Sequence, residues 1–217
     1  MGYERPELPV GVYVDEDGTP IEYGNRWGPN GPPEGAYSRT SNLDRFAGLH
    51  AVAHALIEWL ASTFDVEVET GSQVAADLLL QPDDPIHSVR LTPRSTASAP
   101  LTFVLTSFPG VYLHAGVLHD FHFPVCGCDA CDDDVRSLAD DLEWTVRMVV
   151  TGHYRESVNP QGSEWLGYRL EEPGVRTATG QSRTDEVPIE RSERARHLVP
   201  GAGPWEPWPA RPRSAGG

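Results

Sequence analysis

An alternation of apolar and polar residues in the stretch APLTFVLTSFPGVYLHAGVLHDFHFP most constrains how this chain can fold. β-Branched and aromatic residues fill both halves of the stretch, and Pro109-Gly110, a pair suited to the middle of a type II turn, separates them. After the turn, His114, Asp120 and His122 share one parity. The other parity carries Val111, Leu113, Ala115, Val117, Phe121 and Phe123. Since successive side chains of a strand point to opposite faces, this apolar set is the predicted buried face of an antiparallel meander.

Two helices are predicted to pack on this sheet. Residues 43–63 repeat apolar side chains every three or four positions, and Ser41 with Asp44 resembles a capping box at their start. Residues 133–151 have the same amphipathic spacing. Aspartates cluster at their beginning, where the positive end of a helix dipole favours carboxylates.

The remaining residues suggest one domain with a tail. With a small hairpin at 10–24, the pattern predicts a single α+β domain over residues 1–174, whose antiparallel sheet has about four to six strands. Residues 175–217 are rich in Arg, Ser, Gly and Pro without periodicity, which predicts a disordered C-terminal tail. Within the tail, Trp205 and Trp208 stand among prolines, in a segment that could dock into a partner's groove.

The charge of the chain is strongly acidic, with a net value of −15. Residues 1–174 hold 27 acidic residues and 10 arginines, residues 175–217 hold 5 and 7, and there is no lysine. An acidic domain repels phosphate backbones and anionic lipid surfaces, so we expect no nucleic-acid or membrane partner and, if any, a protein partner. The start lacks the apolar core of a signal peptide, and no stretch approaches the roughly 20 apolar residues of a membrane span, which predicts a cytoplasmic protein.

All three cysteines lie within six positions, in FHFPVCGCDACDDD. The spacing Cys126-x-Cys128-x2-Cys131, with His122 four residues upstream, offers three sulfurs and one nitrogen. Zinc prefers four tetrahedral ligands of these types, and a reducing compartment keeps such thiols unpaired. The sequence therefore predicts a zinc site formed by Cys126, Cys128, Cys131 and His122. The alternative fourth ligands are His119, Asp129 and Asp132.

Two other interpretations of the cysteines stay open. Cys128 and Cys131 have the spacing of a thioredoxin-type dithiol between a strand and a helix, although neighbouring aspartates oppose the thiolate that such chemistry needs. Free cysteines are also often buried without a role. A closed zinc site predicts a non-enzymatic protein with a structural metal. The alternatives are a thiol oxidoreductase using Cys128 and Cys131, or a metal-dependent hydrolase whose ion keeps an open position.

Other candidates for catalysis form weaker patterns. His50, His54 and Glu58 recur every four residues in the first helix, a spacing that can serve metal binding or acid/base chemistry. The zinc-protease signature H-E-x-x-H is absent, so structural histidines are the simpler interpretation. His114 stands alone in the sequence and is predicted to be a surface or capping residue.

Four segments, IEYGNRW, RFAGLH, LTFVLTSFPG and FPVCGCDACDDD, resemble an uncharacterised actinobacterial family, the domain of unknown function 6226. The resemblance spans approximately Val10 to Tyr154 and is most specific in CGCDAC. It implies one shared domain and a soluble bacterial protein, and it implies no activity, substrate or catalytic residue. The zinc prediction rests on the cysteine spacing alone.

Overall fold

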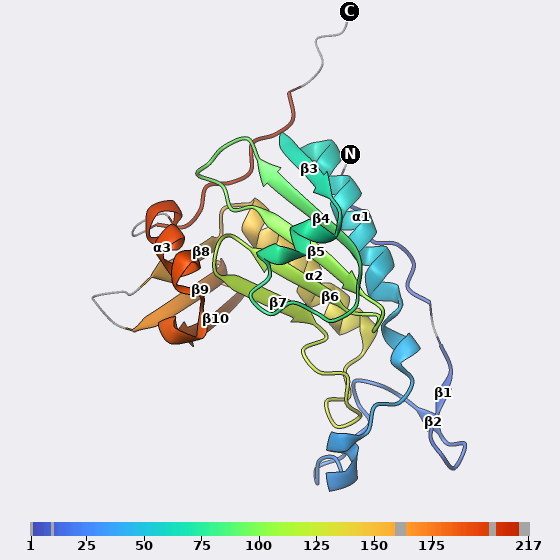
Figure 1. Ribbon diagram of the computed structural model, residues 1–217. Coiled ribbons are helices and arrows are strands. Elements are labelled where there is room, and N and C mark those ends of the chain that lie inside the picture. The colour runs from blue at the N-terminus through green and yellow to red at the C-terminus, as the bar shows by residue number, and fades with distance from the viewer. Residues whose placement is uncertain (1, 10, 159–163, 200–202, 213–217) are drawn as a thin grey trace, which may run out of the picture.

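The computed structural model of the chain describes residues 2–9, 11–158, 164–199 and 203–212. At its centre lies an antiparallel sheet of five strands in the order β3-β4-β5-β6-β7 (Figure 1). Each strand pairs with the next one along the chain, so the predicted meander is confirmed. The five strands are β3 (Val66–Thr70), β4 (Pro85–Pro93), β5 (Leu101–Thr106), β6 (Val111–Ala115) and β7 (His119–Phe123).

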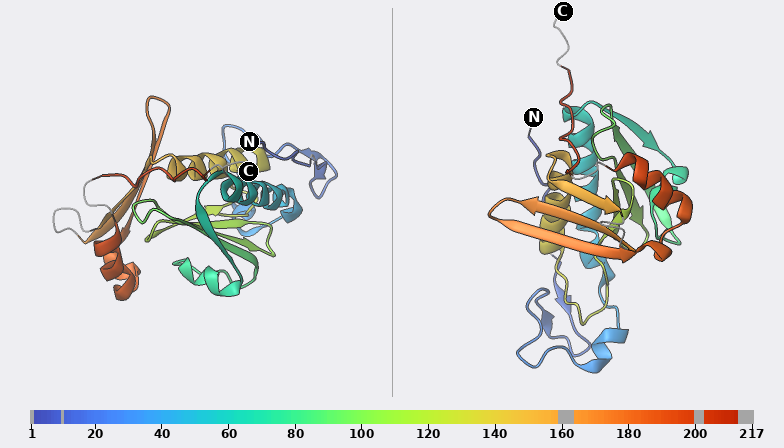
Figure 2. Two further views of the ribbon diagram at one scale, coloured as in Figure 1. Left: turned by 90° about the horizontal axis from the view of Figure 1, so that it is seen from above. Right: turned by 90° about the vertical axis from the view of Figure 1, so that its left-hand side faces the viewer.

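Helices α1 (Gly48–Thr63) and α2 (Val135–Val150) cover one face of this sheet, as the left view of Figure 2 shows. They confirm the helices predicted at 43–63 and 133–151, and only the ends differ. The first predicted turn is a separate 3-10 element, η2 (Leu43–Phe46), which precedes α1.

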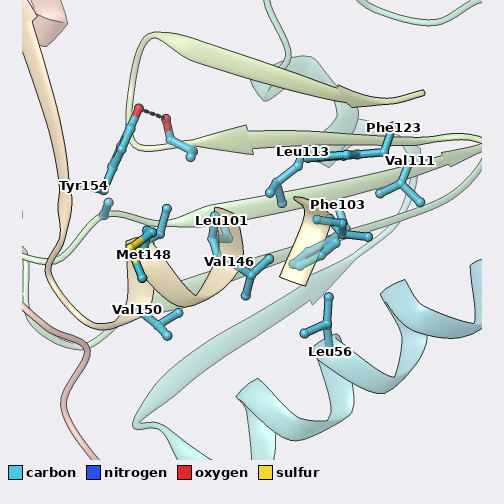
Figure 3. Packing of buried hydrophobic residues seen from close by; sticks show 14 of the residues in the cluster. Leu56, Leu101, Phe103, Val111, Leu113, Phe123, Val146, Met148, Val150 and Tyr154 are labelled. Carbon is cyan, nitrogen blue, oxygen red and sulfur yellow. Dashed lines mark hydrogen bonds between the residues drawn. The ribbon is translucent and has the colours of Figure 1, made fainter. Parts of the chain in front are cut away.

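An apolar core fills the space between the five-stranded sheet and the two helices. Leu56 of α1, Phe103 of β5 and Val146 of α2 meet there, and each is 1% exposed or less (Figure 3). Burying a side chain of this size contributes about 1.5–3 kcal/mol, so this layer dominates the stability of the fold. The predicted buried face is confirmed for Val111, Leu113, Ala115, Val117 and Phe123, while Phe121 is half-buried.

A second antiparallel sheet follows α2, with its strands in the order β10-β9-β8. These strands are β8 (Tyr154–Val158), β9 (Trp165–Glu172) and β10 (Arg176–Arg183). Tyr154 connects the two sheets, because its buried hydroxyl donates a hydrogen bond to the carbonyl oxygen of Ala115 in β6 at 3.1 Å (Figure 3). Its ring also lies edge-on to Phe121 of β7.

Short elements complete the fold. A hairpin of β1 and β2 confirms the one predicted at 10–24, although Val10 lies outside the described residues. Element η3 lies on the face of the five-stranded sheet away from α1 and α2, which we call the outer face (Figure 2). The short elements are β1 (Tyr13–Val14), β2 (Pro20–Ile21), η1 (Glu34–Ser38), η3 (Ser72–Asp77) and η5 (Thr184–Glu186). None of the helices in the described ranges has the length and apolar character that a membrane span requires.

The chain after residue 174 differs from the predicted disordered tail. Strand β10 and helix α3 (Ile189–Leu198) form there, and residues 203–212 run along the core as an extended segment, the C-terminal strap. The pattern of β10 was not recognisable because it is an edge strand in which exposed and half-buried residues alternate. Residues 213–217 lie outside the described residues, and the division of the chain at residue 174 stays a prediction.

Two tryptophans anchor the C-terminal strap to the core. Trp205 and Trp208 are only 3% and 4% exposed. The indole N–H of Trp208 donates to the carbonyl oxygen of Ala99 at 2.8 Å, and the backbone N–H of Trp208 donates to the carbonyl oxygen of Val150 at 2.9 Å. The two buried indoles supply a large apolar area that holds the segment on the core. The Gly- and Pro-rich composition around them gave no sign of this order in the sequence. The segment thus docks on the core of its own chain.

Glu156 of β8 is a buried carboxylate that connects the strap to the turn between β6 and β7. It accepts hydrogen bonds from the backbone N–H of Leu118 at 2.8 Å and from the indole N–H of Trp205 at 3.0 Å. A Cβ atom at Gly116, whose φ is +70°, would collide with this carboxylate. Burial raises the pKa of Glu156 to about 7. The hydrogen bonds from Leu118 and Trp205 act to lower this pKa, but burial outweighs them.

We expect Trp208→Ala to lower the free energy of unfolding by about 3–5 kcal/mol, the usual cost of removing a buried aromatic side chain. Trp165→Ala is the matched control, because Trp165 is 42% exposed and its loss should cost only about 0.5 kcal/mol. Denaturant unfolding of both variants measures the difference. Equal costs for the two tryptophans would contradict the anchoring role of the strap.

A second prediction concerns pH. The raised pKa means that folded Glu156 keeps its proton up to about pH 7, whereas an unfolded glutamate loses it near pH 4.5. The stability that Glu156 contributes is therefore present below pH 4.5 and is lost as pH rises through 7, by up to about 3 kcal/mol. The comparison is with Glu156→Gln, which does not titrate. The difference in free energy of unfolding between the two proteins should fall over this range, and a pH-independent difference would overturn the assignment.

Candidate metal centre

All three cysteines lie in the segment between β7 and α2, and we call residues 124–134 the cysteine loop. The loop begins with a cis peptide bond before Pro124 and ends where the side chain of Asp134 caps α2. Asp134 accepts hydrogen bonds from the backbone N–H groups of Arg136 at 2.9 Å and Ser137 at 3.1 Å. In Figure 1 the loop lies at the lower end of the molecule, beside the segment that carries β1, β2 and η1. Regular structure therefore fixes both of its ends.

The three cysteine sulfurs converge. They lie within 4.8 Å of one another, and Sγ of Cys128 is 3.5 Å from Sγ of Cys131. The backbone N–H of Cys128 donates to Sγ of Cys126 at 3.4 Å. Around a tetrahedral zinc ion with Zn–S bonds of about 2.3 Å, sulfurs are about 3.8 Å apart. The group could therefore hold one metal ion after small adjustments.

The three thiols differ in their surroundings. Cys128 is buried, whereas Cys126 and Cys131 are exposed residues. Hydrogen bonds from the Cys126 thiol and from backbone groups lower the pKa of Cys128. Partial burial of the sulfur, together with the neighbouring thiols, raises the pKa of Cys131 to about 12. Without a cation, Cys128 is thus the sulfur of this pair that is more readily deprotonated.

His122, the predicted fourth ligand, is not part of the sulfur group. Cross-strand register places it opposite Tyr112 on the outer face of the sheet, where the two ring centroids are 4.3 Å apart. Burial lowers the pKa of His122, and within the described residues its buried Nε2 has no hydrogen-bond partner. The structure brings together three of the four predicted ligands.

The alternative fourth ligands are also outside the sulfur group. The ring of His119 packs edge-on against Tyr168. One carboxylate oxygen of Asp132 accepts the backbone N–H of Arg26 at 2.7 Å, while the other is buried without a partner among the described residues. Asp129 is fully engaged in hydrogen bonds, which gives it a different role.

Asp129 attaches the cysteine loop to the N-terminal residues. This buried carboxylate accepts the backbone N–H of Ser41 at 2.8 Å, the hydroxyl of Ser41 at 2.7 Å and Nε of Arg39 at 3.0 Å. Burial alone would raise the pKa of Asp129, but these hydrogen bonds outweigh it and the pKa is lowered. The prediction that Ser41 caps the first helix is wrong, because its hydroxyl bonds to Asp129. Asn42 begins η2 in a left-handed conformation, without a side-chain cap.

Further contacts come from the N-terminal arm (residues 24–45). The buried guanidinium of Arg45 donates to the carbonyl oxygen of Gly127 at 3.3 Å. The indole N–H of Trp27 donates to the carbonyl oxygen of Asp129 at 3.1 Å. Sequence reasoning did not identify Arg45 or Trp27 as part of the site, and it considered Asp129 only as a possible metal ligand. The arm holds the loop backbone in place and leaves the sulfurs to face one another.

Comparison with known proteins identifies one family. A family model described as "Family of unknown function (DUF6226)" matches residues 9–212. The matched range extends beyond Tyr154, where the sequence resemblance was expected to end, and includes α3 and the C-terminal strap. No curated protein and no solved structure matches the chain.

We expect Asp129→Ala to lower the free energy of unfolding by about 2–3 kcal/mol, because it removes hydrogen bonds to a buried charge. The cysteine loop should also loosen, so that a thiol-reactive dye labels Cys128 faster than in the wild type. Asp83→Ala is the control, since Asp83 is exposed and makes no side-chain hydrogen bond within the described residues. Unchanged labelling of Cys128 in Asp129→Ala would show that the loop does not depend on this carboxylate.

Proposed function

The chain belongs to the DUF6226 family, a family of unknown function, and we propose that its cysteine loop binds one Zn²⁺ ion as a structural staple. The observation that carries the proposal is the convergence of three sulfurs within 4.8 Å of one another. Thiolate ligands select soft or borderline metals, among which zinc is the usual structural ion. The ion would tie the end of β7 to the start of α2.

The surroundings of the cysteine loop support a structural role over a catalytic one. A catalytic zinc needs a cleft in which water and substrate reach the ion. Two cavities adjoin the loop, one beside Tyr23 and Arg45 and the other beside Trp27 and Arg39, and no cysteine lines either of them. We therefore propose a non-enzymatic protein, with a metal-dependent hydrolase as the less favoured alternative.

The fourth coordination position of the ion falls to a donor outside the sulfur group. His122 stays the predicted ligand, and it would have to leave its contact with Tyr112 to reach the sulfurs. A water molecule or a side chain from a protein partner is the alternative donor. The protein partner, the cytoplasmic location and the actinobacterial source stay predictions.

A thiol oxidoreductase is the second candidate, and the 3.5 Å separation of the Cys128 and Cys131 sulfurs favours it. Closing this pair into a disulfide would release two protons and two electrons, which reduce an external disulfide to two thiols. The burial of Cys128 opposes this function, because an attacking thiolate must be accessible.

Elemental analysis of the purified protein is the direct test. We expect one zinc per chain in the wild type and loss of the zinc in Cys126→Ser, Cys128→Ser and Cys131→Ser. A chelator should lower the unfolding temperature of the wild type but not of these variants, because only the bound form is stabilised. Ser38→Ala, an exposed change in the N-terminal arm, is the control and should keep its zinc.

Other outcomes separate the candidates. Zinc retained in His122→Ala would exclude His122 as the fourth ligand. Metal-free wild type with a reversible disulfide between Cys128 and Cys131 would favour the oxidoreductase. Metal-free protein whose thiols stay reduced under mild oxidation would refute both functions.

A further inference from the structure

A row of polar residues crosses the outer face of the five-stranded sheet. Glu69 of β3 pairs with Arg90 of β4, Arg90 with Thr102 of β5, Thr102 with His114 of β6, and His114 with Asp120 of β7. Residues directly opposite one another on neighbouring strands share a face. The adjacent row of Leu91, Leu101 and Ala115 is buried in the core beneath the helices. The polar row therefore points away from α1 and α2.

One half of the polar row is fixed by Asp77 at the end of η3. Its carboxylate accepts Nε of Arg90 at 2.6 Å and the hydroxyl of Thr102 at 2.6 Å. Arg90 also donates to Glu69 at 2.5 Å. Although burial opposes the charge of Asp77, these partners lower its pKa. Arg90 is thus neutralised by two carboxylates and serves as a rigid part of the face.

The other half is a histidine–carboxylate pair. Nδ1 of His114 is 2.6 Å from Oδ1 of Asp120, and their side chains are only 6% and 7% exposed. The second oxygen of Asp120 accepts the backbone N–H groups of Leu79 at 2.7 Å and Leu80 at 3.1 Å. Because a carboxylate accepts hydrogen bonds, Nδ1 of His114 carries the proton of this bond. The pair fixes the orientation of the imidazole.

The opposite nitrogen of this imidazole is accessible from a cavity. Nε2 of His114 makes no hydrogen bond within the described part of the chain, and this nitrogen is not fully buried. His114 lines a cavity of about 400 Å³, together with Trp205 of the strap and the hydroxyl residues Ser95 and Thr96. This volume is within the usual range of small-molecule sites. Nε2 is therefore the nitrogen that a ligand in the cavity can contact.

Two arginines of α3 complete the wall of the cavity. Arg191 donates to the backbone carbonyl oxygens of Ala76, at 2.7 Å, and Asp77, so no carboxylate neutralises it within the described residues. Arg194 makes neither an ion pair nor a hydrogen bond among these residues, and it is exposed. Asp77 also lines this cavity, but its carboxylate is paired with Arg90. In a chain of net charge −15, the two guanidinium groups of α3 without carboxylate partners therefore create a local site for an anion.

We propose that this cavity binds a small molecule through an oxyanion, a phosphate or a carboxylate, held by Arg191 and Arg194 and contacted by Nε2 of His114. Guanidinium groups match the geometry of both anions, and the hydroxyls of Ser95 and Thr96 add donors. The site does not rest on the cysteine loop. It lies toward the Ala115 end of β6, whereas the loop leaves β7 at Phe123, which pairs with Val111 at the other end of β6.

The test uses the full-length protein and two probes, inorganic phosphate and succinate, titrated at constant ionic strength. Histidine ring resonances are followed by NMR, and the resonance of His114 is assigned with His114→Gln. We expect a saturable shift of the His114 resonance and no shift of His153, which does not line the cavity and whose ring hydrogen-bonds to Thr151. A response to phosphate alone assigns a phosphate ligand, and a response to succinate alone assigns a carboxylate.

Two α3 variants make the result specific. Arg194→Ala should weaken binding of the responding anion about tenfold or more, since it removes charge-assisted hydrogen bonds. Arg196→Ala, an equal change of charge at an exposed residue that does not line the cavity, should leave the affinity unchanged. Circular dichroism checks that both variants are folded. The proposal fails if neither anion shifts the His114 resonance, or if Arg196→Ala weakens binding as much as Arg194→Ala.

Discussion

The register of strands β3 to β7 determines both faces of the central sheet, and the other elements depend on it. One parity buries Leu101, Phe103 and Leu113 against the helices, and the other presents Thr102 and His114 to the outer face. A slip of one residue in any strand pair would exchange these sets, which would bury charge in the core and expose the apolar layer. The apolar face thus fixes the alignment of the polar row, although the polar residues contribute little to the core.

The cysteine loop obtains its order from outside itself. Its backbone is held by Arg45 and Trp27 of the N-terminal arm, and Asp129 makes the return connection to Ser41. The contacts that hold the loop from outside therefore involve no cysteine side chain, and within the loop the backbone N–H of Cys128 donates to Sγ of Cys126. A cation bound by the sulfurs would add metal–sulfur bonds to a loop whose conformation is already fixed by hydrogen bonds. This preorganisation reduces the conformational entropy that the loop loses when it binds the ion.

The sequence allowed the meander, the two main helices and the sulfur group to be predicted, because each depends on local spacing. It was less informative wherever the partner is distant in the chain. The parity of His114, Asp120 and His122 was visible, but only the pairing of β6 with β7 shows that His114 meets Asp120 while His122 faces Tyr112. The strap was obscured by its glycines and prolines, since its order comes from two tryptophans and their buried contacts. The arginines of α3 are separated from His114 by more than seventy residues of sequence, so no pattern could place them at one cavity.

The carboxylate of Glu156 joins three segments that are far apart in the chain. It receives the indole of Trp205 and the backbone N–H of Leu118, and it occupies the space that a side chain at position 116 would need. The consequence is evolutionary. A larger residue at Gly116 would displace the Glu156 carboxylate, and an apolar residue at Glu156 would leave the indole N–H of Trp205 without its acceptor. An aliphatic residue at Trp205 would in turn remove a hydrogen-bond donor from the buried carboxylate. We therefore expect these three positions to change together among relatives of this chain, or not at all.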